Sequence, residues 1–231
     1  MAQTATLQYG RVASQASVDE RVGFIRKVYL TFFFGVIIYA LGGYLGVTND
    51  ELRAFTFKII QLHWLLYLGL IIGLVFAVQA LSTIPKINYL AFAGFTFLFG
   101  LLCTPLLLYA MQATGGTEVI EQAAILTVSV FGALTFYAFT TKRDFTIYRS
   151  ILTTALILVV VLSVVGIFMG FAGNAWMSII WIILMAGYVI YDTQMIMKKY
   201  PTNMHVAAAI SLFIDFIIMF QRILMLLSRR R

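Results

Sequence analysis

The sequence is poor in charge and in cysteine. Only 11% of its 231 residues are Asp, Glu, Lys or Arg, whereas 62% are hydrophobic, and its mean hydropathy is +0.97. A soluble domain of this length contains about 25% charged residues, so the composition excludes a soluble globular fold and predicts a polytopic membrane protein. The single cysteine, Cys103, excludes an intrachain disulfide and is expected to be a small core residue.

Motifs of several enzyme and cofactor classes are missing as well. The chain has no phosphate-binding glycine-rich loop, no CxxC, no HExxH and no evident Ser/His/Asp triad. Its two histidines, His63 and His205, are far apart in the sequence, so a zinc site is not expected. The net charge of +7 falls mostly in short loops, where it orients a chain in the bilayer rather than binding nucleic acid. We therefore expect neither an enzyme nor a cofactor-binding protein.

Seven apolar stretches are each long enough to cross a bilayer as a helix. They cover residues 28–47, 63–84, 88–111, 119–140, 150–172, 175–197 and 206–228. The predicted fold class is an all-α membrane protein with seven transmembrane helices. Its organisation would be a cytoplasmic N-terminal arm (1–27), a transmembrane domain (28–228) and a basic C-terminal tail (229–231).

Local patterns add two expectations about the helices. Ser17 followed by Glu20 has the spacing of a capping box, which predicts an interfacial helix over 17–27. The glycine pairs Gly69/Gly73 and Gly166/Gly170 have the small-xxx-small spacing that allows helices to approach closely, which predicts packing within the molecule, with a dimer contact as the alternative.

The distribution of Lys and Arg favours a cytoplasmic N-terminus. With this orientation the outside loops hold only Arg53 and Lys58. The inside regions hold Arg11, Arg21, Arg26, Lys27, Lys86, Lys142, Arg143, Arg149, Lys198 and Lys199. Seven spans would place the basic tail 229–231 outside, whereas a re-entrant last segment would return it to the cytoplasm, and the sequence leaves both possibilities open.

Two acidic residues, Asp192 and Asp215, lie well inside apolar segments. The other seven lie in loops, in the N-terminal arm or at segment ends: Asp19, Glu20, Asp50, Glu51, Glu118, Glu121 and Asp144. A carboxylate at the centre of a spanning helix costs about 2.5–3.5 kcal/mol on insertion scales, so an intramembrane acid indicates a functional site.

The short connection between these segments should bring the two carboxyl groups together. Residues 199–205 contain Pro201, and so short a connection favours antiparallel neighbouring helices. Asp192 would lie roughly 9 Å from this connection and Asp215 roughly 13 Å. Two like charges at similar depth in a low-dielectric site do not both ionise easily, so the pair is expected to share a proton. The alternative is that each aspartate separately caps a backbone group or faces a water pocket.

Helical spacing suggests supporting polar residues around the pair. Tyr188 lies four residues before Asp192, and Ser211 lies four residues before Asp215, so each could offer a hydroxyl group from the same face. Arg222 lies seven residues after Asp215, roughly 10 Å further along the axis. It would either pair with Asp215 by a long reach or extend to the outer membrane interface.

The same segments resemble a known family. Gly187–Gln194 (GYVIYDTQ) resembles the signature of the Bax inhibitor-1 family, the transmembrane Bax-inhibitor-motif proteins. Residues 140–144 (TTKRD) are similar to that family's loop after the fourth span, and residues 211–216 (SLFIDF) resemble its last helix. The resemblance implies a bundle with a central seventh helix and a calcium leak gated by an aspartate pair, matching Asp192 and Asp215. Some bacterial members are expected to place an arginine on the second helix, but span 63–84 here has neither Lys nor Arg.

These observations lead to the hypothesis of a pH-sensitive calcium leak channel of a bacterial inner membrane. Asp192 and Asp215 would form its gate, its pH sensor and a weak site for Ca²⁺, which prefers carboxylate and carbonyl oxygens. An alternative is a non-conducting membrane regulator that binds other membrane proteins, such as a membrane protease. An intramembrane aspartyl protease lacks its GxGD surroundings here, and a proton-coupled transporter would be expected to show broken helices or repeats.

The charge distribution predicts which loops face the cytoplasm. Cysteines introduced beside Lys142 and Lys198 should react with thiol reagents only from the cytoplasmic side, because both positions lie in inside loops of the N-in topology. Labelling of either position from outside intact cells would contradict this topology.

Overall fold

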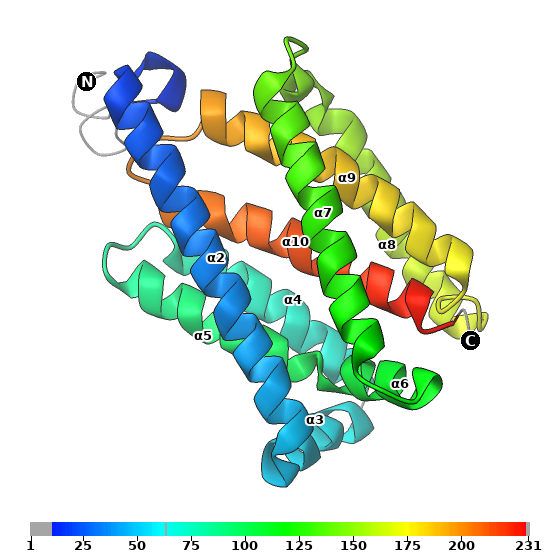
Figure 1. Ribbon diagram of the computed structural model, residues 1–231. Coiled ribbons are helices and arrows are strands. Elements are labelled where there is room, and N and C mark those ends of the chain that lie inside the picture. The colour runs from blue at the N-terminus through cyan, green and yellow to red at the C-terminus, as the bar shows by residue number, and fades with distance from the viewer. Residues whose placement is uncertain (1–10, 63, 230–231) are drawn as a thin grey trace. The chain divides into compact units, whose positions relative to one another are not determined.

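The structure, a computed structural model, is all-helical over the residues that it describes, 11–62 and 64–229 (Figure 1). Residues 1–10 of the predicted arm, His63, and Arg230 and Arg231 of the predicted tail lie outside the described residues. The elements are η1 (Ala13–Gln15), α2 (Val18–Thr48), α3 (Asp50–Leu62), α4 (Trp64–Leu81), α5 (Ile87–Leu102), α6 (Thr104–Thr114), α7 (Glu118–Thr140), η2 (Phe145–Tyr148), α8 (Arg149–Phe168), α9 (Ala175–Lys198) and α10 (His205–Leu227).

Six stretches of the described chain are long and apolar enough to cross a membrane. They are α2, α5 together with α6, α7, η2 together with α8, α9 and α10. The predicted second span corresponds to α4, whose apolar part, Leu66–Leu81, is shorter than the others. The prediction of an all-helical membrane protein is therefore confirmed in its class, and the count of seven spans is not confirmed.

The start of α2 differs from the prediction in one respect. The Ser17 hydroxyl accepts a hydrogen bond from the backbone N–H of Glu20 at 3.3 Å, as the capping pattern predicts. However, the helix that begins there is not a separate interfacial helix, because α2 continues without a break to Thr48. The capping residue thus starts the first spanning helix itself.

The third predicted span, 88–111, is broken in the structure at Cys103. Helix α5 ends at Leu102 and α6 begins at Thr104, and Pro105 explains the break because it has no backbone N–H to continue the helical ladder. Cys103 is free and buried at this point.

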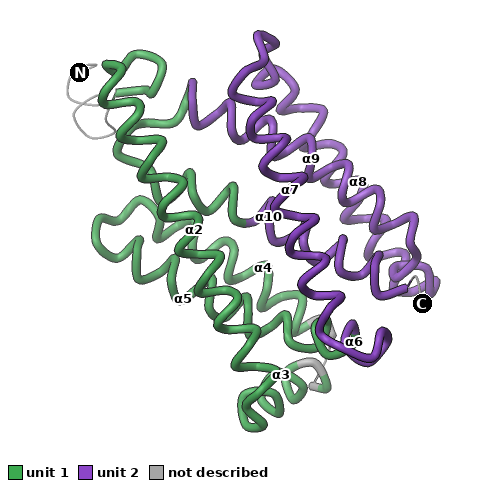
Figure 2. The backbone as a smooth tube through the Cα atoms, in the orientation of Figure 1, with its two compact units in different colours: residues 1–109, 199–213 green, residues 110–198, 214–231 purple. Residues whose placement is uncertain are grey.

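The chain forms two compact units, shown in Figure 2. Unit 1 comprises residues 1–109 and 199–213, and unit 2 comprises residues 110–198 and 214–231. Helix α10 contributes its first turns to unit 1 and the remainder to unit 2. Each unit is described by itself below.

In each unit the α10 segment lies in the core. In unit 1, the ring of Phe213 makes edge-to-face contacts with Tyr39 of α2 and with Phe92 and Phe95 of α5. In unit 2, the ring of Phe216 meets Phe131 of α7 edge to face, with centroids 5.3 Å apart. Aromatic packing therefore anchors both parts of the last helix, and its position at the centre of a whole bundle stays a prediction.

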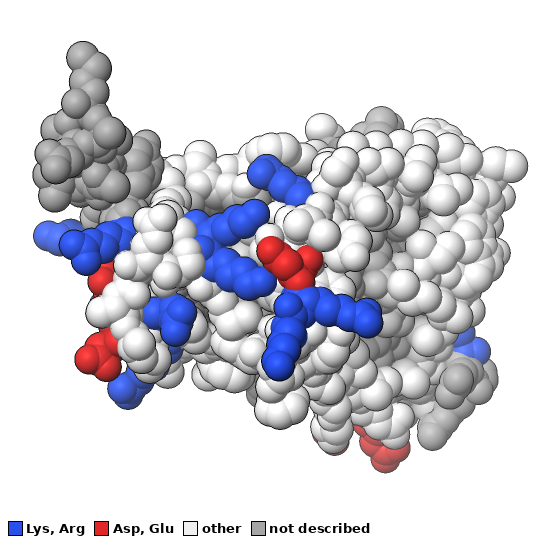
Figure 3. All heavy atoms as spheres, turned by 90° about the horizontal axis from the view of Figure 1, so that it is seen from above, with Lys and Arg blue, Asp and Glu red and all other residues white. Residues whose placement is uncertain are grey.

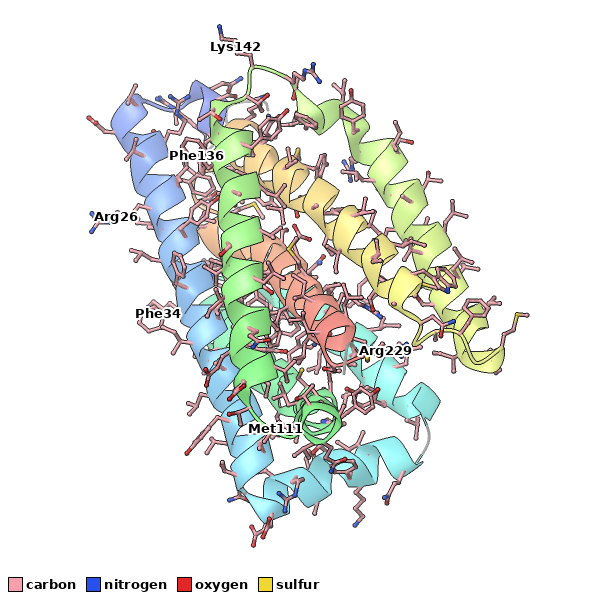
Figure 4. The ribbon with its side chains drawn as sticks, turned by 45° about the vertical axis from the view of Figure 1, so that its right-hand side comes forward. Arg26, Phe34, Met111, Phe136, Lys142 and Arg229 are labelled. Atoms are coloured by element: carbon pink, nitrogen blue, oxygen red, sulfur yellow. The ribbon has the colours of Figure 1, made fainter. Side chains whose placement is uncertain are left out.

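The outer surfaces of the helices are apolar, as a lipid environment requires. Phe34 on α2 and Phe136 on α7, both labelled in Figure 4, are 65% and 70% exposed. Helix α8 exposes large apolar side chains on successive turns, among them Ile151, Ile157 and Val161. Most of the face seen in Figure 3 is neither acidic nor basic. Soluble proteins rarely expose apolar surface on this scale, so these faces fit contact with acyl chains.

Close helix contact in unit 1 depends on glycines that the spacing argument did not select. A Cβ atom on Gly100 of α5 would collide with the backbone carbonyl oxygen of Tyr39 on α2, and one on Gly42 would collide with the carbonyl oxygen of Phe97. Gly69 and Gly73, in contrast, have open space where a Cβ would lie. The prediction of close packing through Gly69 and Gly73 is therefore wrong.

The backbone contact between α2 and α5 predicts a selective effect of alanine. Gly100→Ala should destabilise the protein by about 1–3 kcal/mol, because the added methyl group meets main chain that does not move aside. Gly94→Ala on the same helix is the control, since that site is open and alanine favours the helix. Thermal unfolding in detergent checks both variants, and equal midpoints would contradict the contact.

Candidate carboxyl-pair site

Two helices of unit 2 bring Asp192 and Asp215 into side-chain contact. Asp192 lies near the C-terminal end of α9, and Asp215 lies on the part of α10 that belongs to this unit. A side-chain hydrogen bond joins the two carboxyl groups. Asp215 is 5% exposed and Asp192 is half-buried. The two intramembrane acids therefore form one site.

The contact between the two carboxyl groups has a chemical requirement. An ionised carboxylate is only an acceptor, so a hydrogen bond between two carboxyl groups needs one O–H donor. The pair accordingly holds at least one proton while the contact is made. Within the part of the chain that the structure describes, Oδ2 of Asp215 is buried and has no hydrogen-bond partner. This oxygen therefore has no N–H or hydroxyl donor in that region besides the proton that the two carboxyl groups share.

Few other polar groups surround the pair. Tyr188 and Tyr191, on the same helix as Asp192, are the tyrosines close enough to interact electrostatically with that carboxyl group. Among residues 11–62 and 64–229, the ion pairs join Arg53 to Asp50 and Lys198 to Asp144, and neither involves the pair. Thr193 Oγ1 is also buried without a hydrogen-bond partner in this described region. The carboxyl groups must therefore balance their charge by protonation or by binding a cation.

The predicted hydroxyl supports have other partners in the structure. The Tyr188 hydroxyl pairs with the side chain of Thr153 on α8. The Ser211 hydroxyl lies 3.2 Å from the hydroxyl of Tyr200, within unit 1. Helical spacing placed both hydroxyls on the right helices, but each is used to hold a neighbouring segment instead of a carboxyl group.

Among the ion pairs of residues 11–62 and 64–229 none joins Arg222 to Asp215, and the predicted extension of Arg222 to the outer membrane interface stays a prediction. The guanidinium group of Arg222 lies over the ring of Trp181 on α9, 4.8 Å from the ring centroid. The indole N–H of Trp181 in turn donates a hydrogen bond of 3.0 Å to the Ser163 hydroxyl on α8. The cation–π contact thus joins α10 to α9, and the hydrogen bond of Trp181 joins α9 to α8.

The pair alone offers few ligands to a metal ion. No group of three or more His, Cys, Asp or Glu side chains within the described ranges is placed to hold one. Ca²⁺ takes six to eight oxygen ligands, so two carboxyl groups would have to be supplemented by water or carbonyl oxygens. The geometry fits transient contact with a hard cation better than tight storage.

The sequence did not lead us to predict a polar cluster that lies on the opposite side of α9 from Asp192. The Gln194 side chain, 0% exposed, accepts a hydrogen bond from the backbone N–H of Phe145 at 2.8 Å and donates one to the carbonyl oxygen of Arg143 at 2.9 Å. Lys198 donates to Asp144 at 3.1 Å and to the side-chain carbonyl of Gln194 at 3.3 Å. The signal was available, because Gln194 and Lys198 are four residues apart on one helix face.

Asp144 is the ionised partner in this cluster. Its carboxylate accepts hydrogen bonds from Lys198 and from the hydroxyl and the backbone N–H of Thr146. Because these donors favour the charged form, the bond from Lys198 foremost, the pKa of Asp144 is lowered to about 2. Asp144 is therefore ionised throughout the physiological range.

The fold and this site together define a class of protein: a helical membrane protein with two carboxyl groups in contact between its last two helices. The family model described as "Inhibitor of apoptosis-promoting Bax1" matches residues 21–231. The chain belongs to this family, the Bax inhibitor-1 family, which confirms the resemblance seen in the sequence.

Similar proteins occur in bacteria, in an animal and in a virus. An uncharacterized protein of Campylobacter jejuni is 32% identical over 206 residues, which are 88% of this chain and 87% of that protein. "Protein lifeguard 4" of Mus musculus is 32% identical over 95% of this chain and 90% of its own length. A "Golgi anti-apoptotic protein" of vaccinia virus is 30% identical over 95% of this chain and 91% of its own length.

The Asp144 cluster gives a pH prediction with a defined sign. A lowered pKa means that the contribution of this carboxylate to stability is complete above about pH 4 and is lost as the pH falls towards 2. Because the ion pair is largely solvent-exposed, that contribution should be below about 1 kcal/mol. Lys198→Met should raise the pKa of Asp144 towards its ordinary 3.8, whereas Lys199→Met should not. Carbon NMR of the labelled carboxyl group checks both variants, and an unchanged titration in Lys198→Met would refute the assignment.

Proposed function

We propose that the protein is a pH-sensitive leak channel for Ca²⁺ and that the carboxyl pair Asp192/Asp215 is its gate and its pH sensor. The single observation that carries this proposal is the side-chain contact between two acids from neighbouring apolar helices. A carboxyl group inside a spanning helix has a high free-energy cost. A functional role in sharing a proton would explain why two such groups are present. We further propose that the chain lies in a bacterial inner membrane with its N-terminus in the cytoplasm.

The gate would act through the loss of the shared proton. While that proton is present, the hydrogen bond holds α9 and α10 together at this level of unit 2. When it leaves, two adjacent negative charges repel each other and the contact between the helices is lost. The apolar surroundings strengthen this effect, because a low dielectric screens the repulsion poorly.

The same event would create a site for the transported ion. Two carboxylates offer the hard oxygen ligands that Ca²⁺ prefers, and in the part of the chain that the structure describes no N–H or hydroxyl group competes for Oδ2 of Asp215. Protons and Ca²⁺ would therefore compete for one site. Two protein ligands would bind the ion weakly, which suits passage down a gradient.

A second candidate function is a non-conducting regulator that binds other membrane proteins. The names of two relatives favour it, since the viral protein is called a Golgi anti-apoptotic protein and the mouse protein is called lifeguard 4. In this case the carboxyl pair would stabilise one conformation for a partner instead of gating an ion. Conduction by the purified protein separates the two functions.

Removal of either carboxyl group tests the sensor. Asp192→Asn and Asp215→Asn each keep the side-chain shape but remove an ionisable group. Each should flatten the pH dependence of Ca²⁺ flux into liposomes between about pH 6 and 8, where a proton-sharing carboxyl pair titrates. The double variant should add little to either single variant, because the two groups titrate as one unit.

The control for this measurement is Asp19→Asn, which makes the same chemical change at an exposed position in the first turn of α2. It should keep the wild-type pH profile. If each site variant also keeps a full pH response, the pair is not the sensor. If wild-type liposomes pass no Ca²⁺ above protein-free controls from about pH 5 to 8, a range that covers such a pair, the regulator function is favoured.

A further inference from the structure

Gln194 lies on α9, on the side of the helix opposite to the carboxyl pair. It follows Asp192 by two residues, and two residues correspond to a rotation of about 200° around a helix. Asp192 faces Asp215 on α10, and Gln194 faces the segment between α7 and α8. The two side chains therefore leave α9 on nearly opposite sides, one towards the site and one towards its support.

The contacts of Gln194 are suited to fixing the rotation of the helix. Its amide group binds the backbone N–H of Phe145 and the backbone carbonyl of Arg143, which flank Asp144. A bidentate contact to main chain defines both the position and the orientation of the side chain. Because Gln194 is fully buried, water does not replace these hydrogen bonds at small cost.

Lys198 extends the same contact by one turn. It donates to Asp144 and to Gln194 itself, so two side chains on one face of α9 hold the three-residue segment 143–145. Asp144 also caps η2, because its carboxylate accepts a hydrogen bond from the backbone N–H of Thr146. On the side of α9 away from Asp215, the two successive turns that carry Gln194 and Lys198 are therefore held by segment 143–145.

We propose that Gln194 is a positioning residue for the carboxyl pair: by binding the backbone on both sides of Asp144, it sets the rotation of α9 at which Asp192 meets Asp215. The inference rests on the proposed function in that it concerns the regulation of the same site. Without this clamp, α9 is free to rotate by a fraction of a turn, and the carboxyl groups separate or become hydrated.

Several charged or titratable groups around α9 have to be separated from this effect. Tyr188 and Tyr191 lie on α9 itself, and Arg149 of α8 acts on Tyr191. On α10 the facing group is Asp215, and on the α7–η2 segment it is Asp144. The acidic residues of α7, Glu118 and Glu121, lie in its first turn, at the end away from η2. Lys198 loses its hydrogen bond to Gln194 in the variants but keeps the one to Asp144, and none of the other groups named here is bonded to the Gln194 side chain.

Two substitutions of Gln194 change its contacts in graded steps. Gln194→Met keeps the length of the side chain and removes both hydrogen bonds to the segment. Gln194→Asn keeps the amide group but is one methylene shorter, so it weakens both hydrogen bonds and serves as the milder variant if the first does not fold. Gln122→Met, an exposed glutamine on α7 of the same unit, is the matched control.

The readout is the infrared carbonyl-stretch band of protonated carboxyl groups, followed against pH in the purified full-length protein. The part of this band that disappears in Asp192→Asn or in Asp215→Asn is assigned to the carboxyl pair. In Gln194→Met its midpoint should move to lower pH by about one unit or more, because separated carboxyl groups release a proton more readily. Gln194→Asn should show a smaller shift, and Gln122→Met should show none.

The outcomes separate this inference from the proposed function. A shifted band in a protein that passes no Ca²⁺ supports the positioning role and rejects the channel. If both Gln194 variants pass Ca²⁺ and show the carboxyl band and pH midpoint of the wild-type protein, the positioning role is overturned. This holds even if the variants unfold at a lower temperature, because Gln194 would then only stabilise the fold. Absence of any titrating carboxyl band in the wild-type protein also overturns it.

Discussion

The hydrogen bond between the carboxyl groups of Asp192 and Asp215 is the constraint on which the account of this protein depends. It requires a proton, because two ionised carboxylates are both acceptors and repel each other. It also joins two apolar helices that offer few other polar contacts near this point. Because the bond is lost when both carboxyl groups are ionised, we propose that the local packing of α9 and α10 depends on pH.

The rest of unit 2 holds the two helices so that this contact forms. The ring of Phe216, next to Asp215, packs against Phe131 of α7. Arg222 lies over Trp181 and joins α10 to α9 two turns from the pair. At the opposite side of α9, Gln194 binds the segment that leads into η2. Aromatic packing, a cation–π contact and a buried amide thus define the positions from which the carboxyl groups meet.

Much of this arrangement could be predicted from the sequence, and the missing parts have physical reasons. The scarcity of charge revealed the membrane class and the two intramembrane acids, because burial of a charge is costly enough to leave a clear pattern. The partners of Tyr188 and Ser211 were missed, since a hydroxyl group can bond to any nearby acceptor and helical spacing defines only a face. The contact of Gly100 with Tyr39 depends on the tertiary approach of two helices, which no local spacing records. The break at Cys103 could have been predicted from Pro105.

The central claim is that the pair holds one shared proton that leaves near neutral pH. A potentiometric titration of the purified protein between about pH 5 and 9, a range that covers such a pair, counts that proton directly when the double variant Asp192→Asn/Asp215→Asn is subtracted. The account predicts a difference of one proton per molecule, released in a single step, and a shift of that step to lower pH when Ca²⁺ is added. A difference curve with no proton released in this range would contradict it.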